Sequence, residues 1–219
     1  RSPHGERGLK LVDPLPYIQS VANVTTSEGG AARESDESLA ERVYLAPSGY
    51  STAGPSDAYV YWAKTFNAGI GSVVPVSPEP GKVDVYVLMT DGSMPGEELL
   101  QELQDYLTEE RIRPMTDLVT VKKPEAVEFS VDLTYYINRS DQAKAVTIQE
   151  NVKKAVAEYT TWQTSEIGRD INPDELVQRI KAAGAKRVEL TAPTFAVVGE
   201  TQVAKCTASA ADNGGLEDD

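Results

Sequence analysis

The sequence predicts an α+β protein in which a short helical segment precedes two small α/β sandwich units, ordered ββαβ and then βααβ(β). Apolar residues recur at helical spacing before residue 71 and alternate with a period of two from residue 73. The strands also alternate with helices too irregularly for a doubly wound parallel sheet. We predict an extended arm or linker (1–34), a helical segment (35–71), a first α/β unit (72–124), a second α/β unit (125–207) and a disordered acidic tail (208–219).

The first 71 residues contain an arm and two helices. Pro14 and Pro16 predict extended chain, and the Gly29-Gly30 pair indicates a turn at the end of the arm. Ser35 predicts a helix start, because its hydroxyl can cap a helix and two acidic residues follow it. That helix carries Leu39 and Val43 on one face and stops before Pro47. Ser56-Asp57 begins a second helix with a spaced apolar stripe: Tyr59, Trp62, Ala63 and Phe66.

The first α/β unit begins with strands at 73–76 and 82–88, joined by a turn at 78–81. A helix with Pro95 in its first turn follows, and its last turn is predicted to hold Arg111 and Arg113 before Pro114 ends it. Its apolar stripe consists of Leu99, Leu103, Tyr106 and Leu107. A strand at 118–121 completes the unit.

The second unit opens with the clearest pattern, a strict alternation of apolar and polar residues from Val127 to Ile137 that predicts a long strand with one buried face. One helix starts at Ser140-Asp141, and a second starts where Asn172 caps and Pro173 takes the first helical position. Strands are expected around 188–190 and over 202–207. The tail from 212 to 219 has four acids, no bases and two glycines, which predicts disorder.

The composition excludes several functions. The chain has 219 residues and 21 basic against 34 acidic side chains, a formal net charge of −13. This acidity argues against nucleic acid as a partner, and no apolar run is long enough to span a membrane. Cys206 alone permits no intramolecular disulfide, and one Cys with one His (His4) cannot supply a zinc site or a histidine-based acid–base site. The polar start without an initiator Met, and without a secretory leader, indicates a piece of a longer protein.

A search for chemistry finds no catalytic, metal-binding or cofactor-binding residues. The sequence has no phosphate-binding loop, no Asp-x-Asp-x-Asp-Gly loop and no Gly-x-Ser-x-Gly elbow. Its two acidic groups lie at predicted helix N-termini, where the helix dipole favours acids: Asp36, Glu37 and Glu41, and Glu97, Glu98 and Glu102. Cys206 is interpreted as a small buried side chain of a terminal strand.

Two aromatic residues stand in polar surroundings. Tyr50 lies in a Gly/Ser/Pro loop, and Trp162 lies in a polar stretch that we place after a helix. Such residues often anchor protein interfaces, which makes both interface candidates. The alternative is that each ring folds back as a lid over the core of its own domain.

The order of motifs along the chain resembles the Baseplate J-like family. The resemblance covers residues 21 to 207, and its central part is Gly29-Gly30, then Glu34-Ser35-Asp36-Glu37, Glu41-Arg42-Val43 and Ala46-Pro47. Further matching positions are Gly54, Asp57-Ala58-Tyr59, Ala63, the spaced residues of 76–85, the run 111–117, Gly168, Ile171, Leu176, Ile180, Val188, Leu190 and Pro193. The chain departs at Gly184-Ala185, where many members have Gly-Val, and it lacks the family's N-terminal region.

This resemblance implies a structural wedge protein of a contractile-tail baseplate, in a phage or in a phage-derived injection particle assembled in the bacterial cytoplasm. Its implied partners are other baseplate proteins and copies of itself, with no catalytic residues, cofactor, nucleic acid, membrane or small-molecule substrate. Two alternatives stay open: a carboxylate-dependent hydrolase associated with a baseplate, with two carboxylates roughly 5–10 Å apart in a cleft, and a generic protein-binding adaptor.

Overall fold

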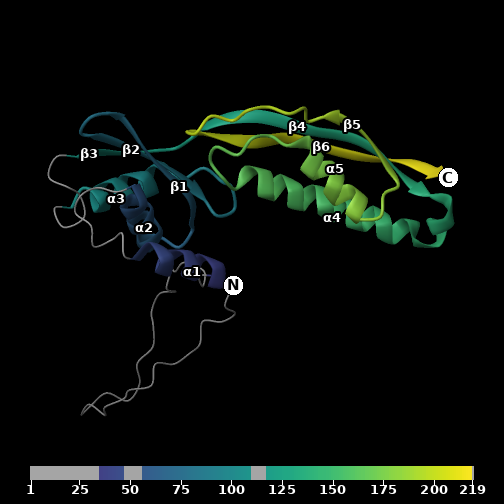
Figure 1. The fold of residues 1–219 in the computed structure, drawn as a ribbon, viewed down its shortest axis with the longest axis horizontal. Coiled ribbons are helices and arrows are strands. Elements are labelled where there is room, and N and C mark those ends of the chain that lie inside the picture. Colours follow the sequence, from purple (N-terminus) through teal and green to yellow (C-terminus); the bar gives the residue numbers. More distant parts are fainter. Residues whose placement is uncertain (1–34, 47–55, 110–116, 219) are drawn as a thin grey trace, which may run out of the picture. The chain divides into compact units, whose positions relative to one another are not determined.

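The computed structural model describes residues 35–46, 56–109 and 117–218, which form helices and two three-stranded sheets (Figure 1). This confirms the predicted α+β class. The predicted arm (1–34) and the loop that holds Tyr50 lie outside the described residues. We call residues 35–122 of the described chain the first lobe and residues 125–218 the second lobe.

The first lobe begins with α1 (Asp36–Leu45) and α2 (Ser56–Phe66). Ser35 caps α1 as predicted, because its side chain accepts a hydrogen bond of 3.2 Å from the backbone N–H of Ser38. Helix α2 buries Tyr59 and Ala63. Helix α1 buries only Leu45 among its apolar residues, so Leu39 and Val43 form an exposed face.

The predicted ββαβ order of the first lobe is confirmed by β1 (Ile70–Glu79), β2 (Lys82–Met89), α3 (Glu97–Leu107) and β3 (Leu118–Lys122). β2 lies in the centre, antiparallel to β1 and parallel to β3. Two boundaries differ from the prediction. β1 begins at Ile70, inside the segment predicted as helical, and α3 ends at Leu107, so Arg111 and Arg113 are not in its last turn. Arg111, Arg113 and Pro114 lie outside the described residues.

The second lobe places β4 (Glu125–Asn138) between β5 (Arg187–Ala192) and β6 (Gln202–Glu217). A short 3-10 helix, η2 (Arg139–Lys144), leads into α4 (Ala145–Thr164), and α5 (Pro173–Ala182) follows. Both α-helices cover one face of this sheet (Figure 1). The predicted alternation of β4 is confirmed, because the side chains on the helix side are buried: Phe129, Val131, Leu133, Tyr135 and Ile137.

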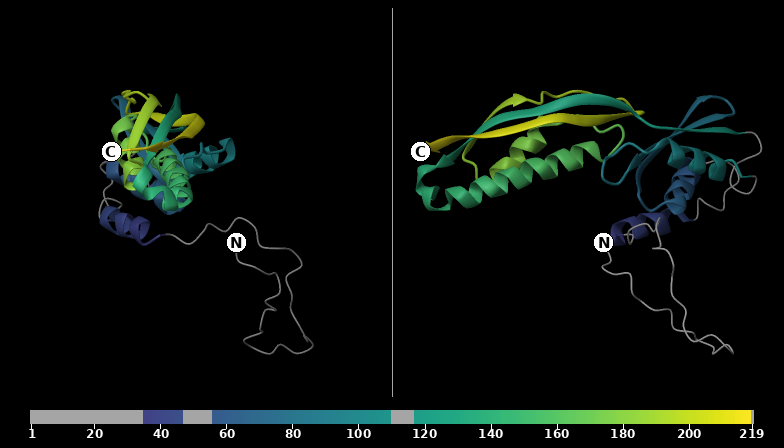
Figure 2. Two further views of the ribbon diagram at one scale, coloured as in Figure 1. Left: turned by 90° about the vertical axis from the view of Figure 1, so that its right-hand side faces the viewer. Right: turned by 180° about the vertical axis from the view of Figure 1, so that it is seen from behind.

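The predicted disordered tail is wrong, because β6 continues through it to Glu217. β6 runs parallel to β4 along its whole length, and the last pairs join Ile137 to Leu216 and Asn138 to Glu217 (Figure 2). The acids at the end are neutralised by bases from other elements, since Glu217 pairs with Arg187, and Asp218 pairs with Arg139 at 2.6 Å. Pairing with a distant strand therefore orders a segment whose local composition favours disorder.

A third apolar cluster joins the two lobes. Leu88 of β2, Ile167 after α4 and Val203 of β6 pack together in the interior. The backbone N–H of Ile167 also donates to Ser72 Oγ of β1 at 3.3 Å. Gly92 of the first lobe lies against the end of α4: its φ is +77°, and an added Cβ would lie 2.8 Å from the backbone oxygen of Thr164. A side chain at position 92 would therefore be strained both by its backbone angle and by this contact.

Candidate functional site

Trp162 lies in the last turn of α4, not after a helix as predicted, because α4 extends through Thr164. Its half-buried ring packs against the core of the second lobe and lies 6.1 Å from the ring of Tyr159. Two guanidinium groups flank the indole, with Arg169 Cζ 4.3 Å and Arg179 Cζ 5.4 Å from the ring centre. Such stacking is a cation–π contact within the lobe. Trp162 therefore covers its own core, and its role as an interface anchor stays a prediction.

Tyr50, the other interface candidate, lies outside the described residues, and its role stays a prediction. The structure describes exposed apolar side chains that the sequence did not predict as interface candidates. On α1, Tyr44 is 82% exposed beside Val43, and after β5, Val197 is 73% exposed in the same segment as Phe195. In the sequence, the exposed residues after β5 belong to a run of four apolar residues at 195–198, shortly after Pro193.

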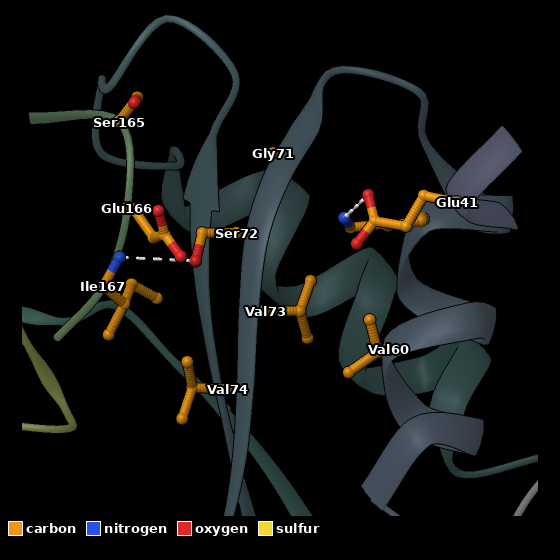
Figure 3. Close-up of a pocket in the computed structure, with 10 residues that line it drawn as sticks. Glu41, Val60, Gly71, Ser72, Val73, Val74, Ser165, Glu166 and Ile167 are labelled. Atoms are coloured by element: carbon orange, nitrogen blue, oxygen red, sulfur yellow. Dashed lines mark hydrogen bonds and ion pairs between the residues drawn. The ribbon is translucent and has the colours of Figure 1, made fainter. Parts of the chain in front are cut away.

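A cavity of about 370 Å³ in the described chain carries two acidic side chains. Its walls come from α1, α2, β1 and the segment after α4, and Figure 3 shows its residues. Glu41 and Glu166 are its two carboxylates, and they lie on opposite sides of β1 in this view. The rest of the lining consists of Lys64, the polar residues Ser72 and Ser165, Gly71 and four apolar side chains.

Neither carboxylate of this cavity is set up for acid–base chemistry. Glu41 binds Lys64 Nζ at 2.5 Å, Glu166 binds the guanidinium of Arg169, and each acid is about half exposed. A general acid needs the opposite surroundings, namely an apolar environment that keeps its proton near neutral pH. The arrangement thus provides ion pairs, which is a structural role.

The acidic groups predicted at the helix N-termini are likewise spread over surfaces. Glu97 pairs with Lys123 at 2.9 Å, while Asp36, Glu37 and Glu98 are exposed on the first turns of α1 and α3. Within the described residues, no three His, Cys, Asp or Glu side chains lie close enough together to hold a metal ion. None of the described helices combines the length and apolarity needed to cross a bilayer.

The groups with shifted pKa values serve structural purposes. Burial raises the pKa of Tyr159 to about 12, so its hydroxyl stays protonated and donates to the backbone oxygen of Asn172 at 3.1 Å. On the opposite face of the sheet, hydrogen bonds from Arg187 lower the pKa of both Glu189 and Glu217. Arg187 also stacks on the ring of Tyr136, with its Cζ 4.0 Å from the ring centre. Cys206, which was predicted to be buried, is only half-buried and packs against the core of the second lobe.

Comparisons with known proteins agree along the chain. The family described as Baseplate J-like central domain matches residues 51–123, and the one described as Baseplate J-like protein C-terminal domain matches residues 131–208. Baseplate protein J of Escherichia phage P2 is 31% identical over 190 residues, which is 86% of this chain and 62% of that protein. The chain thus spans less than two thirds of this relative.

A solved structure has the same fold at low sequence identity. One chain in the cryo-EM structure of the anti-feeding prophage baseplate superposes with a TM-score of 0.54 and 14% identity. The match covers 90% of this chain and 47% of that one. At this identity the similarity concerns the fold alone.

Proposed function

Because the chain belongs to the Baseplate J-like family, we propose that it is a structural subunit of a contractile-tail baseplate and works by protein–protein assembly. The observation that carries the proposal is the match to baseplate protein J of phage P2, which extends over 86% of the chain. We place the protein in the wedge of a phage or phage-like particle that is assembled in the bacterial cytoplasm. Its partners are then other baseplate proteins and further copies of itself.

The surface chemistry supports an assembly role. Exposed apolar side chains on α1 and after β5 offer area that becomes buried when proteins associate: Leu39, Val43, Tyr44, Phe195 and Val197. The net charge of −13 makes nucleic acid an unfavourable partner. We propose that neither a membrane nor a small-molecule substrate is involved, and that the protein is not an enzyme.

The hydrolase alternative gains no support from a specific feature. It requires a carboxylic acid with a raised pKa facing a second carboxylate across a cleft. The cavity acids Glu41 and Glu166 are each held by a base and are half exposed. We therefore do not put it forward as a second function.

The proposal is tested by electron microscopy of particles made with and without the protein. We expect cells that lack it to produce no complete baseplates, and a copy supplied in trans to restore them. A double variant, Glu41→Gln with Glu166→Gln, should restore baseplates as well as the unaltered protein does, because it removes both cavity carboxylates and leaves the apolar surfaces intact. Complete baseplates in the absence of the protein would refute the proposal. Normal particles that lose infectivity only with the double variant would favour the hydrolase.

A further inference from the structure

The two sheets have four outer edges, and three of them carry features that prevent further strand pairing. On β3, the side chain of Gln104 occupies the edge: its Nε2 donates to Val119 O at 2.7 Å, and its Oε1 accepts from Val121 N at 2.6 Å. On β1, Pro75 and Pro78 cannot donate backbone hydrogen bonds. β5 has six residues and is followed directly by Pro193.

The fourth edge, on β6, is different. This strand has 16 residues and no proline, and among the described residues no strand lies on its outer side. From Lys205 to Asp212 most side chains are exposed, and the central ones are small and uncharged: Thr207, Ala208, Ser209 and Ala210. Between its two register irregularities, β6 keeps an unbroken register with β4 from Ala208 to Asn213. A long edge without proline and without a neighbouring strand can accept another strand.

The charges at the two ends of this stretch indicate which strand fits. Lys205 pairs across the sheet with Glu128, and Asp212 pairs with Thr134, and both partners are on the polar face of β4. Paired residues share a face of the sheet. The irregularity at Thr207 adds one residue, which brings Lys205 and Asp212 to the same face although they are seven positions apart.

We propose that the β6 edge pairs antiparallel with the β6 edge of a second copy of this chain, with Ser209 opposite Ser209 on the two-fold axis. In this register, with Thr207 left as the extra unpaired residue of each strand, Lys205 of each copy faces Asp212 of the other, so the interface gains two opposite-charge pairs. Parallel pairing in register would instead place Lys205 against Lys205. The result is a six-stranded sheet with the order β5-β4-β6-β6-β4-β5. The inference names the self-contact of the assembly function proposed above, and it rests on that function for its role in a particle.

Disulfide crosslinking tests the position of the contact in the whole chain. Directly opposite residues of an antiparallel pair have Cβ atoms about 4.5–5.5 Å apart, close to disulfide reach. With the native thiol removed by Cys206→Ser, Ser209→Cys should give a crosslinked dimer under mild oxidation. The matched control is Thr191→Cys in the same background, an exposed position on β5 at the other edge of the sheet, which should form no disulfide-linked dimer.

Charge exchange tests the register. Lys205→Asp and Asp212→Lys, made singly, each replace two opposite-charge pairs by two like-charge pairs. Each should weaken dimerisation roughly tenfold in sedimentation experiments at low salt. The double variant Lys205→Asp with Asp212→Lys restores the pairs in the reverse sense and should dimerise as the unaltered chain does.

Equal crosslinking at positions 209 and 191 would overturn the inference, and so would double-variant dimers as weak as those of the single variants. Circular dichroism of every variant identifies any that fail to fold. If a charge variant fails to fold, the Ser209→Cys crosslink still tests the β6–β6 contact by itself. The outcome is separable from that of the proposed function. A chain that is required for baseplates but does not crosslink at position 209 refutes only the β6 pairing, whereas a crosslinked chain that is dispensable for baseplates refutes only the function.

Discussion

Gln163 is a fully buried side chain on α4, and its amide holds the loop between α4 and α5. Its Nε2 donates to the backbone oxygens of Arg169 and Asp170 at 3.2 and 3.0 Å, and its Oε1 accepts from the N–H of Asn172 at 3.3 Å. Asn172 in turn caps α5. One side chain thus satisfies three backbone groups at the point where the chain turns back towards the sheet.

We predict that Gln163→Leu lowers the free energy of unfolding by about 2–4 kcal/mol, because it keeps the volume of the side chain but leaves those backbone groups without partners. Urea unfolding followed by circular dichroism measures the change. Gln178→Leu on the exposed side of α5 is the control and should alter stability by less than about 0.5 kcal/mol. Equal effects of the two substitutions would contradict this account of Gln163.

At the scale of elements, the C-terminal end of β6 depends on charge. Arg187 of β5 donates to Glu217 of β6, with its Nε 3.1 Å from Oε2, and it also contacts Glu189 on its own strand. These hydrogen bonds lower the pKa of both glutamates below the ordinary value of 4.5. A lowered pKa in the folded state stabilises the fold above the unfolded-state pKa and loses that contribution as the pH falls through the folded-state value.

The end of β6, residues 213–217, is therefore predicted to be ordered at neutral pH and to detach from β4 as the pH falls well below 4.5. Backbone amide relaxation measured by NMR across this pH range reports the change, and residues near Val203, which is buried, should not respond. In Arg187→Gln the same segment should be mobile already at neutral pH. An end of β6 that stays rigid in acid would show that backbone pairing alone holds it.

At the scale of the whole described chain, the cluster of Leu88, Ile167 and Val203 links the two lobes. All three side chains are buried, so the contact removes apolar surface of both lobes from water. Unfolding of one lobe exposes this surface on the other. The two cores are therefore expected to unfold together.

Two tryptophans make this testable, because Trp62 lies in α2 and Trp162 lies in α4. Fluorescence of Trp162→Phe follows the first lobe, and fluorescence of Trp62→Phe follows the second. We predict coincident urea midpoints for these two proteins. Adding Leu88→Ala should lower stability by about 2–5 kcal/mol and separate the midpoints, whereas the exposed control Leu118→Ala should leave them together. Separate midpoints before any core substitution would contradict the coupling.

Features that depend on neighbouring residues follow from the amino-acid sequence alone. Ser35 and Asn172 cap helices because a side-chain oxygen reaches an N–H two or three residues away. The buried face of β4 follows from its alternation of apolar and polar residues, because only one orientation of the strand places all the apolar side chains on the core side of the sheet. The ordered motifs indicated the family that the comparisons then matched.

Features that depend on residues far apart in the chain are set by the packing of distant elements. The composition of residues 212–217 predicts disorder. They nevertheless form a strand, because β4 pairs with their backbone and Arg187 forms an ion pair with Glu217. The sequence left open whether Trp162 covers its own core, and the structure places its ring on that core between Arg169 and Arg179. Leu39 and Val43 form an apolar face that remains exposed. Local sequence patterns indicate which side chains are stabilised by burial, a hydrogen bond or an ion pair. The packing of distant elements determines which of these side chains make such contacts within the chain and which remain exposed for assembly.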